Sequence, residues 1–79
     1  LFYLQRGHDA FQMLEPMAEH FPENEAIPYN LACYACQFGD LELALDWYRV
    51  AEKVGEPEKI QEVALMDPDM ELLWEQIKE

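Results

Sequence analysis

Similar residues recur along this chain at an offset of 34 positions, and this recurrence constrains the fold more than any other feature. Ala10 recurs as Ala44, and the other equivalent positions keep their apolar character. These pairs are Phe11 and Leu45, Met13 and Trp47, Leu14 and Tyr48, Met17 and Ala51, and Leu31 and Leu65. Such a period predicts stacked supersecondary units, because one unit cannot bury its apolar face alone.

Helix start and stop residues punctuate the whole chain and predict an all-α fold. Glycine closes apolar-periodic stretches at Gly7, Gly39 and Gly55, as it does at helix C-termini. Asp40 is placed to cap one helix, and Asp67 precedes a proline that can start another. No segment alternates as a strand does. The expected helices cover residues 1–6, 8–20, 25–38, 41–54, 57–66 and 68–78, and their short connections predict antiparallel hairpins.

The stretch from Glu25 to Glu58 matches a known repeat pattern of this length. The matching residues are Leu31, Ala32, Gly39, Ala44, Tyr48 and Ala51. The chain therefore resembles the tetratricopeptide repeat (TPR) family, whose units are helix–turn–helix pairs of about 34 residues. It departs from the family pattern at Pro28 and Ala35, which stand in the places of two aromatic residues, and Pro57 comes one residue late.

The resemblance implies one domain over residues 1–79, an all-α, TPR-like right-handed superhelix of antiparallel helix hairpins with about two and a half repeats. Residues 1–23 are expected to form a partial first repeat with a shortened turn after Gly7. Residues 24–56 form the central repeat, and residues 57–79 form a degenerate capping helix pair. Because the first residue is not methionine and three full repeats are lacking, we expect a fragment of a longer protein or a domain that pairs with its copy.

The charge balance separates classes of partner. Seventeen acidic and five basic residues give a formal net charge of −12. This argues against nucleic acid, because phosphate contacts need clustered Lys and Arg, and against anionic membrane surfaces. No apolar run reaches the roughly 18 residues that a membrane span requires, and there is no signal-peptide pattern at the start. Two cysteines only three positions apart read as free thiols, which predicts a cytoplasmic location.

By the resemblance, the first helix of each repeat lines a concave groove. The expected groove residues are Ala26, Tyr29, Cys33, Cys36, Gln37, Ile60 and Val63. Spacings of three and four residues put them on one helix face. No Lys or Arg stands at these places, so an apolar or helical peptide is expected there rather than a terminal carboxylate. The alternative is that a neighbouring repeat or a second subunit covers this surface.

Few residues offer catalytic chemistry. The chain contains no Ser or Thr, which excludes Ser-type triads, and it has no Gly-rich phosphate loop. The pair Cys33 and Cys36 has the spacing of a redox or half-zinc site. However, it falls in the middle of an expected helix, away from the N-terminus that would stabilise a thiolate. A zinc site needs two more ligands; His8 is expected near the pair, and His20 at the opposite end of the hairpin.

We therefore predict no enzyme, no cofactor and no metal. The predicted function is a non-catalytic module that binds a protein or peptide segment, such as an apolar helix, in the groove. The alternative is a self-associating structural or scaffold unit, a homodimer or larger homo-oligomer joined through repeat ends. A metal or redox site at the cysteine pair is the distant third. Trp47 and Trp74 are expected in core or cap positions, and an exposed Trp47 would be a candidate partner contact.

Overall fold

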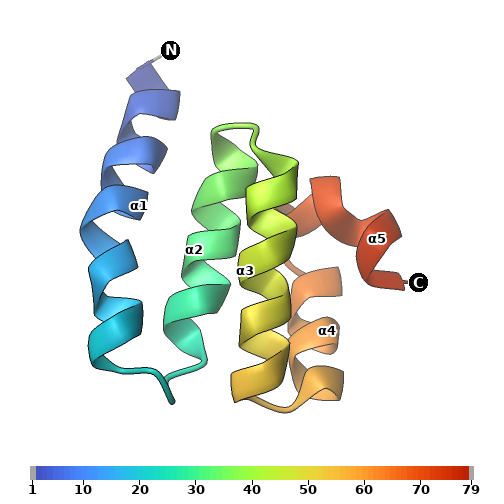
Figure 1. Cartoon of the computed structure of the whole chain (residues 1–79). Coiled ribbons are helices and arrows are strands. Elements are labelled where there is room, and N and C mark those ends of the chain that lie inside the picture. Colours follow the sequence, from blue (N-terminus) through green and yellow to red (C-terminus); the bar gives the residue numbers. More distant parts are fainter. Residues whose placement is uncertain (1, 79) are drawn as a thin grey trace.

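The computed structural model describes the backbone of residues 2–78 and the side chains of residues 9–78. Within this range the chain forms five α-helices and one 3₁₀ helix, without a strand, so the predicted all-α class is confirmed. The elements are α1 (Phe2–His20), α2 (Ala26–Gln37), α3 (Leu41–Val54), α4 (Pro57–Leu65), η1 (Pro68–Leu73) and α5 (Trp74–Lys78), shown in Figure 1. The bounds of α3 are as predicted, and those of α2 and α4 differ from the prediction by one residue at most.

The expected helix break at Gly7 is wrong. α1 runs from Phe2 to His20 without interruption, so the two helices expected over residues 1–6 and 8–20 are one, and no turn follows Gly7. A glycine inside a helix costs only about 1 kcal/mol relative to alanine, and no proline follows Gly7 before Pro16. The first unit of the chain is therefore a single long helix in the described residues.

The helix expected over residues 68–78 divides into η1 and α5. Its start is as predicted: Pro68 occupies the first turn, and Asp67 Oδ1 accepts a hydrogen bond of 3.0 Å from the Asp69 amide. In a 3₁₀ helix, residues three apart project from the same side. This geometry directs Met70 and Leu73 together into the core, where both are almost completely buried.

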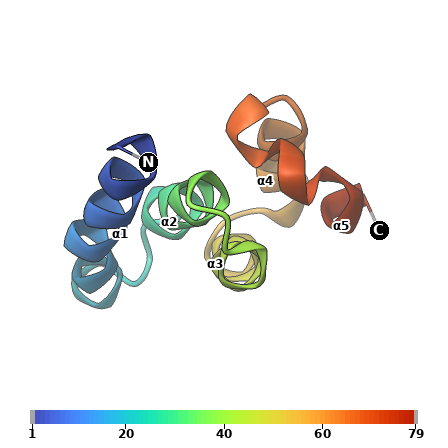
Figure 2. The same ribbon diagram turned by 90° about the horizontal axis from the view of Figure 1, so that it is seen from above.

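The helices form one row of packed elements. α1 and α3 both pack against α2, and α4 packs against α3. Figure 2 shows this order from above, with α4 and α5 beyond α3. η1 packs against α2, whereas the backbones of α2 and α4 do not approach each other closely within the described range. The first helices of the central and third units are thus separated, and the TPR-like superhelix stays a prediction. No helix within residues 2–78 has the length and apolar character needed to cross a bilayer.

Small residues line the contact between α2 and α3. Ala32 and Ala35 on α2 and Ala44 and Ala51 on α3 have no exposed surface. Alanine side chains let two helices approach closely, since the distance between helix axes depends on the side chains at the contact. Ala32, Ala44 and Ala51, which match the repeat pattern, are therefore core residues together with Ala35, and Tyr48 belongs to the same core with no exposed surface.

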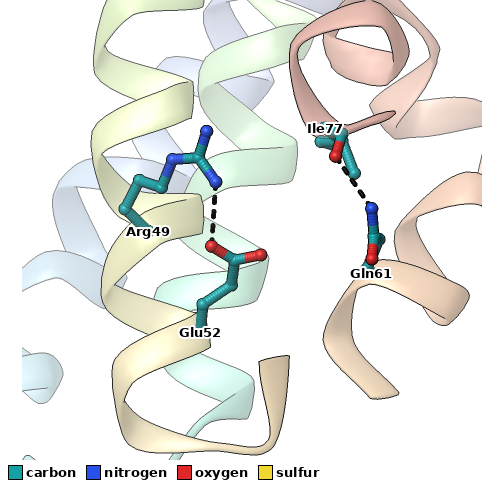
Figure 3. A network of polar contacts seen from close by, with 4 residues as sticks. All are labelled: Arg49, Glu52, Gln61 and Ile77. Atoms are coloured by element: carbon teal, nitrogen blue, oxygen red, sulfur yellow. Dashed lines mark hydrogen bonds and ion pairs between the residues drawn. The ribbon is translucent and has the colours of Figure 1, made fainter. Parts of the chain in front are cut away.

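Side-chain hydrogen bonds attach the C-terminal elements to α4. Trp74 Nε1 donates to the Ala64 carbonyl at 2.7 Å, which confirms that Trp74 packs the terminal helix down. Gln61 Nε2 donates to the Ile77 carbonyl at 2.9 Å, as Figure 3 shows. The other contact in Figure 3, between Arg49 and Glu52, joins residues of α3 at 2.9 Å.

The turn between α2 and α3 combines a glycine with a capping carboxylate. Gly39 has a φ of 90°, a left-handed conformation that favours glycine. It follows Phe38, the C-cap of α2, so the predicted helix end at this glycine is confirmed. Asp40 Oδ1 accepts a hydrogen bond of 3.1 Å from the Leu43 amide, so the predicted cap of α3 is confirmed. The carboxylate satisfies an amide that has no partner inside the helix.

We expect Asp40→Ala to lower the free energy of unfolding by about 1 kcal/mol, the usual cost of losing such a cap. Urea titration followed by circular dichroism measures the change. Asp46→Ala removes the same charge from an exposed position inside α3 and is expected to change stability by less than about 0.5 kcal/mol. Equal losses in the two variants would contradict a capping role.

Candidate functional site

The residues predicted to line the groove do not share one environment. Cys33, Cys36 and Ile60 are buried in the core. Tyr29 and Gln37 are half-buried, and Ala26 and Val63 are exposed. The buried members are inaccessible to a partner in this conformation. The exposed members lie on two helices, α2 and α4, that do not pack against each other.

The chain itself covers part of the predicted groove. η1 packs against α2, and Asp67, just before η1, reaches the α2 face. The Tyr29 hydroxyl donates to Asp67 Oδ2 at 2.9 Å, and the Cys33 thiol donates to the same oxygen at 3.9 Å. The other oxygen of Asp67 caps η1. One carboxylate therefore starts η1 and attaches it to α2.

Burial raises the pKa of both thiols. The pKa of Cys33 rises to about 12, mainly through loss of hydration and then through the Asp67 and Asp69 carboxylates. The pKa of Cys36 rises to about 11 for the same reasons. Burial, together with the hydrogen bond to Asp67, also raises the pKa of Tyr29. Both thiols are thus protonated at neutral pH, and a reactive cysteine needs the opposite, a lowered pKa.

The cysteine pair has few neighbours suited to metal chemistry. Cys33 and Cys36 are free thiols, and no group of three or more His, Cys, Asp or Glu residues in the described part of the chain is arranged to hold a metal ion. His20 is exposed in the last turn of α1, as predicted. The side chain of His8 lies outside the described residues, so its expected approach to the pair is not part of the described structure.

A hollow between α1 and α3 is a feature that the sequence reasoning missed. It has a volume of about 330 Å³ and is lined by Glu15, Pro16, Glu19 and Trp47. Trp47 was expected in a core or cap position, and it does pack against the core. Its ring lies edge-on against Phe11 of α1, with ring centres 6.4 Å apart. The spacing of Glu15 and Glu19 already places both on one face of a helix, but only the tertiary contact brings Trp47 beside them.

Exposed apolar side chains gather at both ends of the row of helices. On α1, Met13 is 79% exposed and Met17 is 39% exposed. At the other end, Val63 is 55% and Met66 80% exposed, and they line a hollow of about 290 Å³ together with Lys59 and Glu62. Contiguous exposed apolar groups mark surfaces that other molecules cover. Of these residues, only Val63 belongs to the predicted groove.

We expect Tyr29→Phe to lower the free energy of unfolding by about 1 kcal/mol, because it removes the hydrogen bond to Asp67. Urea titration measures the loss. Tyr34→Phe is the matched control, since the Tyr34 hydroxyl makes no hydrogen bond within residues 9–78, and we expect a change below about 0.5 kcal/mol. If the control loses as much stability as Tyr29→Phe, Asp67 does not attach η1 to α2 in solution.

The raised thiol pKa values also predict a pH dependence of stability. Well below pH 9, the ordinary pKa of a cysteine, the thiols are protonated in both the folded and the unfolded chain. As pH rises from 9 toward 11, the thiols of the unfolded chain ionise first, so the unfolded chain binds fewer protons and stability falls. We expect the free energy of unfolding to decline over this range, and to decline less steeply in a Cys33→Ala, Cys36→Ala double variant. Urea titrations at several pH values measure the free energy of unfolding of the wild type and the double variant. An equally steep decline with pH in both proteins would contradict this prediction.

Comparison with known proteins gives no relative for this chain. No protein-family model, curated protein or solved structure matches it. The resemblance to the TPR family therefore rests on the matching residues of the central unit, and the comparisons neither support nor contradict it.

Proposed function

We propose that this chain is a non-catalytic protein–protein interaction module of TPR-like helical repeats. The observation that carries the proposal is the exposure of Val63 and Met66 around the hollow on α4. Val63 lies on α4 and Met66 directly follows this helix, and both side chains stay exposed although Ile60 and Ala64 of α4 are buried. A partner that covers them removes apolar surface from water, at about 25 cal/mol for each Å² buried.

The chemistry of the chain supports a binding role over a catalytic one. There is no Ser or Thr to act as a nucleophile, and the pKa values of Cys33 and Cys36 are raised rather than lowered. No polar or charged residue is buried within the described part of the chain, whereas catalytic acids and bases are commonly set by burial. Free thiols accord with a reducing compartment, and a cytoplasmic location is part of the proposal.

The proposed binding surface is narrower than the groove predicted from the sequence. It is centred on Val63 of α4 and on Met66, which directly follows this helix. The groove residues of α2 that keep exposed surface are Ala26, Tyr29 and Gln37. Cys33, Cys36 and Ile60 are buried and are therefore left out of the proposed surface. The expected occupant is an apolar segment of a protein or peptide, because the hollow on α4 holds one Lys and one Glu whose charges offset each other.

Affinity capture with matched variants tests this function. The immobilised wild-type chain is compared with Val63→Lys and with Met13→Lys, which places the same charge on an exposed position of α1. We expect a protein that the wild type and Met13→Lys retain and Val63→Lys loses, since a lysine in the apolar contact would lose its hydration. The purified partner must then bind Val63→Lys with a Kd at least about tenfold higher than its Kd for the wild type. Circular dichroism must show the same helicity for the variant and the wild type. Retention of every captured protein by Val63→Lys would contradict the proposal.

Self-association is the second candidate. Its supporting observation is that exposed apolar residues lie at both ends of the row, Met13 and Met17 on α1 and Met66 and Leu72 beyond α3. A head-to-tail contact between copies would bury both sets. The net charge of −12 opposes it, because each contact would bring like charges together. Analytical ultracentrifugation decides between the candidates, since self-association requires a mass above 9.3 kDa that rises with concentration.

A further inference from the structure

The hollow between α1 and α3 combines an aromatic wall with two carboxylates. Its lining is Glu15, Pro16 and Glu19 from α1 and Trp47 from α3. α1 and α3 lie on either side of α2 (Figures 1 and 2). The hollow therefore joins residues of two helices that both pack against α2. It shares no residue with the surface proposed above on α4.

The indole of Trp47 is held in place by the core. Its ring packs edge-on against Phe11, with an angle of 72° between the ring planes. Phe11 in turn packs edge-on against Phe38, with ring centres 5.6 Å apart. Trp47 itself is only half-buried and lines the hollow with its remaining surface. A fixed, partly exposed indole face attracts cations through its quadrupole, and Trp does so more strongly than Tyr or Phe.

The carboxylates beside the indole lack a counter-ion. Glu15 and Glu19 stand one helical turn apart, and both are exposed. The described part of the chain holds one ion pair, Arg49 with Glu52, and no Lys or Arg lines the hollow. Pro16 contributes ring surface and no amide hydrogen. The hollow therefore combines two carboxylates with the surfaces of Pro16 and the Trp47 indole.

An apolar row on α3 continues from the hollow. Leu43, Trp47, Val50 and Val54 are spaced by four, three and four residues, which places them on one face of the helix. Val50 is exposed and Leu43 and Val54 are half-buried. A segment lying along α3 could thus bury apolar side chains on this row while one of its polar side chains enters the hollow.

We propose that the hollow binds a Lys or Arg side chain of a partner protein, carried on an amphipathic helix whose apolar face covers the row on α3. The cation lies against Trp47 between Glu15 and Glu19, where it gains both the cation–π contact and charge-assisted hydrogen bonds. Charge favours such a partner over a second copy, because a copy brings seventeen acidic residues and only five basic ones. This second surface does not depend on the one proposed on α4.

A designed peptide probes the hollow directly. The probe is an Ala- and Leu-based helical peptide about as long as α3, which has 14 residues, with two Arg residues on its apolar face. The control peptide carries Glu at the same two positions. NMR follows the indole N–H signal of Trp47, which Trp47→Phe assigns and separates from that of Trp74. We expect the Arg peptide, and not the Glu peptide, to shift the Trp47 signal.

Paired charge variants separate the site from general attraction. We expect Glu15→Gln with Glu19→Gln to weaken binding of the Arg peptide at least about fivefold, through loss of the pairing carboxylates. Glu71→Gln with Glu75→Gln removes the same charge from exposed positions outside the hollow and is expected to weaken it less than about twofold. Val63→Lys tests the α4 surface in the same assay and is expected to leave the Trp47 shift in place.

Three outcomes would overturn the proposal. Equal weakening by the two charge pairs would show that the acidic chain attracts the peptide without a site. An unchanged Trp47 signal at saturating peptide would place the peptide elsewhere. A Trp47 signal that shifts with protein concentration alone, together with a rising mass in ultracentrifugation, would show that a second copy occupies the hollow.

Discussion

The burial of α2 between its neighbours is the constraint on which the rest of this structure depends. α2 contains no charged residue, and it packs against α1, α3 and η1. Its small residues, Ala32 and Ala35, meet the alanines of α3 in a fully buried contact. If this helix were exposed, its apolar surface would contact water, which is unfavourable, and it has no charged side chain to be hydrated. The acidic residues of the chain are consequently carried by the helices and turns around α2, and none is buried in the described range.

The same burial places the proposed binding surfaces on the helices around α2. A groove on α2 would need Cys33 and Cys36 to be accessible, but η1 packs against this helix and Asp67 accepts hydrogen bonds from Tyr29 and Cys33. Among the described residues, the large exposed apolar side chains lie outside α2, on α1, α3, α4, η1 and the turns between them. An acidic exterior with apolar hollows at separate places suits a protein that holds partner segments, since burial supplies affinity and charge supplies selection among partners.

The sequence predicted a structural feature correctly where the contacts that form this feature join residues close together in the chain. The cap at Asp40, the left-handed Gly39 and the start at Asp67 involve residues within a few positions of each other, so their patterns were sufficient. The predicted helix end at Gly7 was wrong because glycine can end a helix or continue one at a small cost in stability. The candidate site was harder still. Glu15 and Glu19 were visible as neighbours on one helix face, whereas their proximity to Trp47 depends on how α1 and α3 pack around α2.

The sequence by itself determined that this chain is helical, where most of its helices begin and end, and which alanines lie at the centre of its core. Periodicity and capping act over one or two turns, and a linear pattern records them. Only the tertiary structure decided that α1 is continuous, that residues 68–73 form a 3₁₀ helix, and that η1 rather than α4 packs against α2. These outcomes depend on which apolar surfaces fit together across long stretches of chain. Packing in three dimensions decides which of these surfaces meet, and a local sequence pattern does not describe that packing.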